Sequence, residues 1–144
     1  MLAVAESAGE FCVALMFIRG GQVLGTTTFH PRAPISDAPE VLSAFVAQHY
    51  LERDPPARIY LSHPIDDAET LVDSLSERSG RKLRIGPARR GYPQRWVGLA
   101  MQNAENALRM RDATHSSLSE QFAELGEFLG IGKPVERIEC FDVS

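Results

Sequence analysis

The first clear pattern along the chain is a long apolar run. Residues 11–18 are almost continuously hydrophobic, and a second run with three threonines follows the pair Gly20 and Gly21 and ends before Pro31. Two adjacent glycines accept the positive φ angles of a tight two-residue turn, so this stretch predicts a β-hairpin. Because the first arm is apolar on both sides, we expect it to lie centrally in a covered sheet.

Helical periodicity begins after the hairpin. Asp37 and Glu40 have the spacing of a capping box, and apolar residues recur at helical period from 41 to 50. The same spacing recurs at Asp66 and Glu69, before a second amphipathic stretch that ends at Gly80. The pattern therefore predicts two capped helices.

A third helix is expected to begin at Pro93 and to run for about twenty residues, roughly 30 Å. The polar stretch 114–117 is expected to break it, and a separate helix over 118–129 to follow, ending at Gly130. Short segments at 58–63 and 81–87 separate the helices and predict strands.

The predicted order is hairpin, helix, strand, helix, strand, long helix. Strands that alternate with helices indicate an α/β protein with a mixed, covered sheet. The ribonuclease H-like fold has this succession, with one additional strand after the hairpin that the sequence does not reveal. An extra C-terminal helix and strand would follow the sheet.

Composition adds limits to this picture. The chain has 144 residues, 44% of them hydrophobic and 24% charged, which is typical of a single globular domain without a membrane span. No basic leader precedes an apolar run, so we expect a cytoplasmic location. Cys12 and Cys140 are far apart in apolar segments, so we interpret both as small buried hydrophobes without a disulfide or zinc role.

The charge is distributed unevenly. The net charge is −4, yet residues 78–95 contain seven cations and no acid: Arg78, Arg81, Lys82, Arg84, Arg89, Arg90 and Arg95. Such a basic stripe is typical of a surface that binds phosphates, although a solvated or partner-facing surface would look the same. Tyr92, beside the stripe, could stack on a base, whereas Tyr60 and Trp96 are expected in the core.

Catalytic carboxylates are harder to find. Nucleases of the ribonuclease H-like fold hold two divalent metal ions between acids on neighbouring strands. The predicted first strand contains no acid, and Glu10 precedes it. His63, at a strand end, is the best single catalytic candidate but has no evident partner, and a structural role is the alternative. Asp66 and Asp67 stand where a helix begins, as Asp37 does, and are interpreted as caps.

Three segments carry a family resemblance. "FCVALMFIRGGQVLGTTTFHP", "SERSGRKLRIGPARRG…RWVGLAMQNAENAL" and, most distinctively, "RIECFDVS" resemble the middle of UvrC proteins, the incising components of the bacterial UvrABC excinuclease. That family makes the incisions of nucleotide-excision repair. The resemblance implies damaged DNA and the excinuclease component UvrB as partners of the longer protein, Mg²⁺ or Mn²⁺ as its cofactor, and neither a membrane nor a small-molecule substrate.

The resemblance also implies a domain organisation. Residues 1–10 would be the tail of a preceding linker, 11–112 a ribonuclease H-like domain without catalytic carboxylates, and 113–134 a connecting helix. Residues 135–144 would be the truncated first strand of the next nuclease domain, with Asp142 as a metal-ligand aspartate that acts only in the full-length chain.

Three hypotheses for function follow. The first is a non-catalytic platform without a metal of its own, whose cations contact the DNA backbone: Arg81, Lys82, Arg84, Arg89, Arg90 and Arg95. The second is a protein-interaction module that docks UvrB or another domain of the same protein. A third, less favoured hypothesis is an autonomous metal nuclease that uses His63, Asp66 and Asp67.

Overall fold

The computed structural model describes residues 1–33 and 36–132. The chain divides into two compact units, Met1–Leu108 and Arg109–Ser144. The last predicted segment, residues 135–144 with Asp142 and Cys140, lies outside the described residues.

The first unit is built on one five-stranded sheet. Its strands are β1 (Leu2–Ser7), β2 (Glu10–Arg19), β3 (Gln22–Phe29), β4 (Arg58–Leu61) and β5 (Arg84–Pro87), in the order β3-β2-β1-β4-β5. β1, β2 and β3 are antiparallel neighbours, whereas β4 runs parallel to β1 and β5 parallel to β4. The sheet is therefore mixed, as the sequence predicts.

The predicted hairpin is confirmed. β2 and β3 are joined at Gly20 and Gly21, whose φ angles are 57° and 76°. Positive φ at both central positions is the conformation that a glycine pair adopts at low cost. β3 is exposed along nearly its whole length, which suits the edge of the sheet.

The additional strand lies before the hairpin, so the prediction that residues 1–10 are a linker tail is wrong. β1 pairs with β2 from Leu2↔Leu15 to Ser7↔Glu10, across a turn in which Ala8 and Gly9 have positive φ. Residues 2–5 are buried on both faces, so they show no alternation. A short apolar run of this kind has no hydrophobic period, so the sequence alone cannot distinguish it from a helix or a buried linker.

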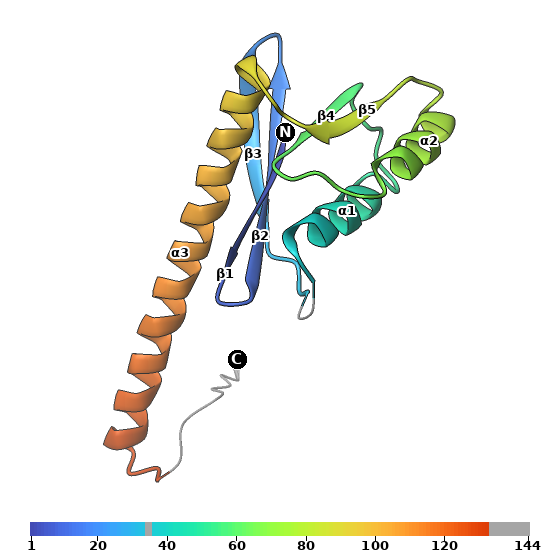
Figure 1. Ribbon diagram of the computed structural model, residues 1–144. Coiled ribbons are helices and arrows are strands. Elements are labelled where there is room, and N and C mark those ends of the chain that lie inside the picture. Colours follow the sequence, from blue (N-terminus) through green and yellow to red (C-terminus); the bar gives the residue numbers. More distant parts are fainter. Residues whose placement is uncertain (34–35, 133–144) are drawn as a thin grey trace, which may run out of the picture. The chain divides into compact units, whose positions relative to one another are not determined.

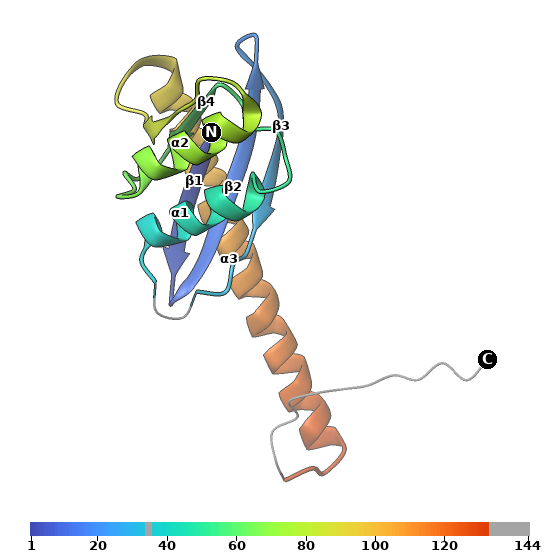
Figure 2. The ribbon, with the colours of Figure 1, turned by 90° about the vertical axis from the view of Figure 1, so that its right-hand side faces the viewer.

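Helices α1 (Ala38–His49) and α2 (Ala68–Ser79) lie on one face of the sheet, and the start of α3 (Gly91–Phe128) lies on the other (Figures 1 and 2). The first core joins α1 and α2 to large side chains of the strands, among them Leu2, Val4 and Leu61. The second core joins Ala100, Ala104 and Leu108 of α3 to side chains of β1 and β2 that are small except for Met16: Ala3, Ala5, Cys12, Ala14 and Met16. The sheet is thus a layer between two different apolar cores.

Helix caps explain where α1 and α2 begin. The Asp37 carboxylate accepts from the Glu40 amide at 2.9 Å, and the Glu40 carboxylate accepts from the Asp37 amide at 3.2 Å, which confirms the predicted capping box. The cap predicted at Asp66 is wrong, because Asp67 is the N-cap residue and its side chain makes no cap hydrogen bond. Instead Asp67 accepts a hydrogen bond from Ser43 of α1 at 2.5 Å. Gly80 ends α2 at φ 64°, as predicted.

The predicted break at residues 114–117 is absent, because α3 continues without interruption to Phe128. Thr114 donates its hydroxyl hydrogen bond to the Met110 carbonyl at 2.8 Å, so the polar side chain is satisfied within the helix. The helix ends before Gly130, whose φ is 66°, with the Ile131 amide bonded to the Gly126 carbonyl. The separate helix expected over 118–129 is the second half of α3.

Candidate nucleic-acid interface

One part of the sheet has no helix over it in the first unit. The α3 core takes its strand residues from β1 and β2, while Ile59 and Leu61 of β4 point into the opposite core beneath α1 and α2. Because side chains alternate along a strand, Arg58 and Tyr60 point to the side that α3 leaves open. We call this surface of β4 and β5 the open face.

Two arginines stand next to each other on the open face. Arg58 of β4 pairs in register with Arg84 of β5, and Tyr60 pairs with Gly86. These four residues line a shallow hollow of about 260 Å³. Gly86 has no side chain, and no heavy atom approaches the position that its Cβ would take. The open face therefore has two adjacent positive groups and an aromatic ring at one exposed surface.

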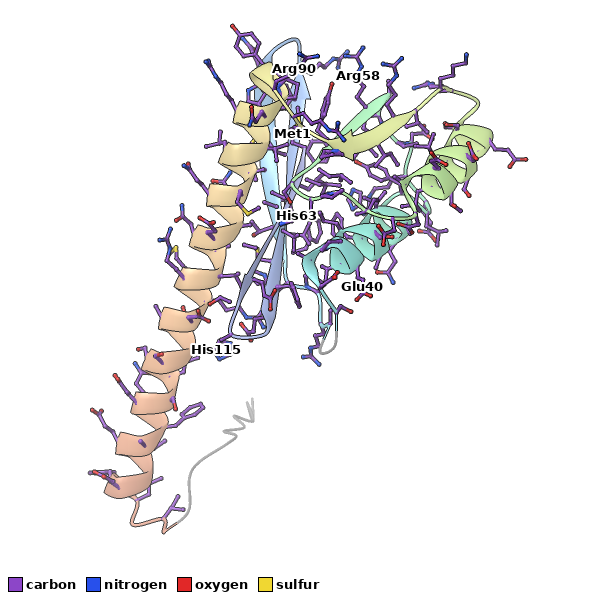
Figure 3. The ribbon with its side chains drawn as sticks, in the orientation of Figure 1. Met1, Glu40, Arg58, His63, Arg90 and His115 are labelled. Atoms are coloured by element: carbon purple, nitrogen blue, oxygen red, sulfur yellow. The ribbon has the colours of Figure 1, made fainter. Side chains whose placement is uncertain are left out.

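More cations flank these strands. Arg81 and Lys82 lie just before β5, Arg89 and Arg90 lie between β5 and α3, and all four are exposed. Figure 3 shows Arg58 and Arg90 toward the same end of the first unit, with His63 farther along it. The basic stripe therefore follows β5 and both of its connections.

Aromatic rings accompany the cations at the start of α3. Tyr92 is 70% exposed, and its ring centroid lies 6.0 Å from that of Trp96. The Arg95 guanidinium lies 5.8 Å from the Tyr92 ring centroid, within the range of a cation–π contact. The backbone of a nucleic acid can bind to such a cation, and its bases can stack on an exposed aromatic ring.

Within the described residues, the arginines of the open face have no acidic partner. Among residues 1–33 and 36–132, the side chains of Arg58, Arg84, Arg89 and Arg90 make no ion pair or hydrogen bond. Arg78 differs, because its guanidinium donates to the Leu51 carbonyl and, at 2.8 Å, to the Arg53 carbonyl. Arg78 therefore fastens α2 to the segment after α1, while the others remain available to an external anion.

The structure adds two residues to those the sequence indicated. Arg58 lies outside the basic stripe in sequence, and only the pairing of β4 with β5 places it beside Arg84. The prediction that Tyr60 belongs to the core is wrong, because Tyr60 lies on the open face and is only half-buried. The alternation of Ile59 and Leu61 around it was the signal that could have revealed this orientation.

The carboxyl end of β4 is where a parallel α/β sheet commonly places a ligand. There Ser62 Oγ accepts from the Val4 amide of β1 at 3.2 Å and lies 2.9 Å from His63 Nδ1. His63 is thus held by its neighbour, which agrees with the structural interpretation. The one acid on β1 is Glu6, and it is exposed.

The residues proposed for an autonomous metal site do not form one. Asp67 is bonded to Ser43, and Asp66 and Asp67 are exposed at the start of α2. Within the part of the chain that the structure describes, no group of three His, Cys, Asp or Glu side chains could hold a metal ion. These residues therefore do not fit the divalent metal pair of a nuclease of this fold.

A mixed sheet with helices on both faces and an apolar central strand defines an α/β domain. The model of the UvrC Ribonuclease H-like domain family matches residues 1–111, so the chain belongs to that family. This confirms both the fold class and the resemblance inferred from the sequence. No helix in the described residues combines the length and apolar character needed to cross a bilayer.

Curated relatives agree with the family. UvrABC system protein C of Ectopseudomonas mendocina (strain ymp) and of Pseudomonas aeruginosa (strain LESB58) are each 40% identical over 148 residues, which cover 100% of this chain and 24% of the relative. The protein of the same name from Stenotrophomonas maltophilia (strain K279a) is 40% identical over 145 residues. The chain thus spans 24% of the length of these relatives. No solved structure matches the chain.

Proposed function

We propose that this chain is a non-catalytic platform of the DNA-incising component of the nucleotide-excision repair excinuclease, and that its open face contacts the DNA backbone. Family membership is established for this domain, and its role in the longer repair protein is what we propose. Damaged DNA and UvrB are its proposed partners, and Mg²⁺ or Mn²⁺ the proposed cofactor of the longer enzyme at another site.

The pairing of Arg58 with Arg84 is the observation that carries this proposal. The two guanidiniums lie on adjacent strands of the open face, and their side chains have no acidic partner among the described residues. Phosphate groups of a nucleic acid would supply the missing negative charge, releasing counterions as they bind. The cations predicted from sequence extend the same surface on both sides: Arg81, Lys82, Arg89, Arg90 and Arg95.

The proposed test is DNA binding by fluorescence anisotropy across a series of salt concentrations. The chain should bind weakly and without sequence preference, and Arg58→Glu with Arg84→Glu should reduce binding at least tenfold at low salt. The slope of log affinity against log salt should fall by about 2, because each lost phosphate contact lowers it by about 1.

Arg32→Glu is the control, because it makes the charge change of one of the two open-face substitutions at an exposed position before α1. It should leave affinity nearly unchanged. If Arg32→Glu weakened binding as much as the open-face variant, a diffuse charge effect would replace the proposed surface. If the chain bound no DNA but retained UvrB in a pull-down, the protein-interaction module would be the better account.

Cleavage should be absent. The chain incubated with DNA and Mg²⁺ or Mn²⁺ should leave it intact, because the carboxyl end of β4 presents Ser62 and His63 bound to each other in place of paired acids. Mn²⁺-dependent nicking that disappears in His63→Ala would contradict the non-catalytic part of the proposal.

A further inference from the structure

The two strands that flank β1 extend beyond its amino end. In the sheet register Leu2 pairs with Leu15 on one side and with Leu61 on the other. β2 continues past this point to Arg19, and β4 begins three residues earlier, at Arg58. Both neighbours therefore project beyond the start of the strand that lies between them.

A cavity of about 410 Å³ lies in that place. Its walls come from the end of β2, the start of β4, and residues on both sides of the sheet such as Tyr50 and Trp96. Strands that are second neighbours in a sheet are roughly 9.6 Å apart, which is the space that one extended chain fills. We call this cavity the strand slot. Figure 3 shows Met1 below Arg58, at the base of this region.

The hydrogen-bond ladder shows which backbone groups face the strand slot. Met1 and Met16 exchange two hydrogen bonds, each of 2.8 Å. Alternate residues of an antiparallel strand face the same neighbour, so the N–H and C=O of Ile18 are the next pair to face the β1 side. Met1 lies opposite Met16, so no residue among those described lies opposite Ile18 on the β1 side.

The same argument applies to β4. The Ser62 amide donates to the Leu2 carbonyl at 2.9 Å, whereas the Ala57 and Leu61 carbonyls accept from the β5 side. Residues of even number on β4 therefore face β1, which directs the Tyr60 amide and the Arg58 carbonyl into the strand slot. Two strands thus present complementary donors and acceptors to the same narrow space.

The amino group of Met1 is poorly solvated at the base of the strand slot. Burial lowers the pKa of this ammonium from 8.0 to about 6. A peptide N–H at the same position could make the bond to the Met16 carbonyl without a charge. The surroundings of Met1 are thus better suited to the interior of a strand than to a charged group.

We propose that an extended backbone segment, which leads into Met1 in a longer chain, occupies the strand slot and prolongs β1 by about three residues. The residue directly before Met1 would donate to the Arg58 carbonyl and accept from the Tyr60 amide. The residue before that would exchange two hydrogen bonds with Ile18. Chains longer than this one occur in the family, since the match covers 24% of each relative. This proposal does not depend on DNA binding.

The experiment compares three chains by residue-resolved amide hydrogen exchange and thermal unfolding. One is the chain itself, one carries the strand-forming extension Thr-Val-Thr before Met1, and the matched control carries Gly-Pro-Gly. Proline has no N–H and so cannot complete the pair with Ile18. The Thr-Val-Thr extension should slow exchange of the Ile18 and Tyr60 amides at least tenfold and raise Tm by roughly 3–8 °C. The Gly-Pro-Gly extension should do neither.

Equal exchange of these two amides in all three chains would overturn the proposal. Protection of both amides already in the chain itself, lost on dilution together with a dimer seen by analytical ultracentrifugation, would also overturn it. A second copy of the chain would then occupy the strand slot.

Discussion

The two faces of the sheet differ in how completely they are covered. Beneath α1 and α2, most inward side chains of β1, β2, β4 and β5 join one core with large residues such as Leu42 and Leu61. On the other face, α3 covers β1 and β2 with small residues, and β4 and β5 stay open. One face is therefore mainly structural, whereas the other is divided between structure and an exposed cationic surface.

This difference indicates which part of the sheet is available to bind a partner. The covered face buries most of its strand side chains against α1 and α2. The open face can bind a partner without disturbing the core, because Arg58 and Arg84 point away from it. Substitutions on the two faces should therefore separate stability from binding.

The largest effect is expected from Leu42→Ala in α1. Leu42 is fully buried in the covered face, so the substitution leaves a cavity and should lower the free energy of unfolding by about 2–5 kcal/mol. Chemical denaturation followed by circular dichroism measures this loss. Leu51→Ala is the control, because Leu51 is 68% exposed and its truncation should change stability by less than about 0.5 kcal/mol. Equal losses in both variants would mean that the covered face is not tightly packed.

A smaller loss is expected from Ala104→Leu in α3. Ala104 is fully buried against small residues of β1 and β2, so three added carbons should overpack the core and cost about 1–3 kcal/mol. Gln102→Leu introduces the same side chain at an exposed position of the same helix. A destabilised Ala104→Leu beside an unchanged Gln102→Leu, measured by thermal unfolding, would support the packing of α3 on the sheet. No loss in either variant would contradict it.

The smallest effect on stability, with the opposite sign, is expected on the open face. Arg58→Gln should raise the free energy of unfolding slightly, by no more than about 0.5 kcal/mol, because like charges paired across strands repel. Adding Arg84→Gln should give little further gain, since the repulsion has already been removed. The gain, measured by chemical denaturation, should disappear at 1 M salt, where charges are screened within about 3 Å. A clear loss of stability instead would show that these arginines are structural.

Local sequence signals predicted much of the fold. The Gly20 and Gly21 turn and the Asp37 and Glu40 capping box depend on residues close together in the chain, and both are confirmed. The predictions that failed concern segments without a local signal. β1 is buried on both faces and so shows no alternation, and Thr114 satisfies its hydroxyl within α3 and so does not end the helix.

The candidate site was predicted in part. A run of cations without acids is visible in the sequence, so the residues that flank β5 can be named from their order in the chain. Their role in binding DNA stays a prediction. Arg58 and Tyr60 could not be assigned to the same surface, because their position beside Arg84 and Gly86 follows from the parallel pairing of two strands separated by a helix.

By itself the sequence determined the helices that have caps and an apolar stripe, the hairpin with its glycine turn, the family, and the basic stripe, because each depends on the order of neighbouring residues. The tertiary structure alone decided that β1 is the central strand, that β4 and β5 stay open on one face, and that β2 and β4 enclose the strand slot. These features arise from hydrogen bonds and packing between segments far apart in the chain. The hydrophobic period of a single segment does not reveal them.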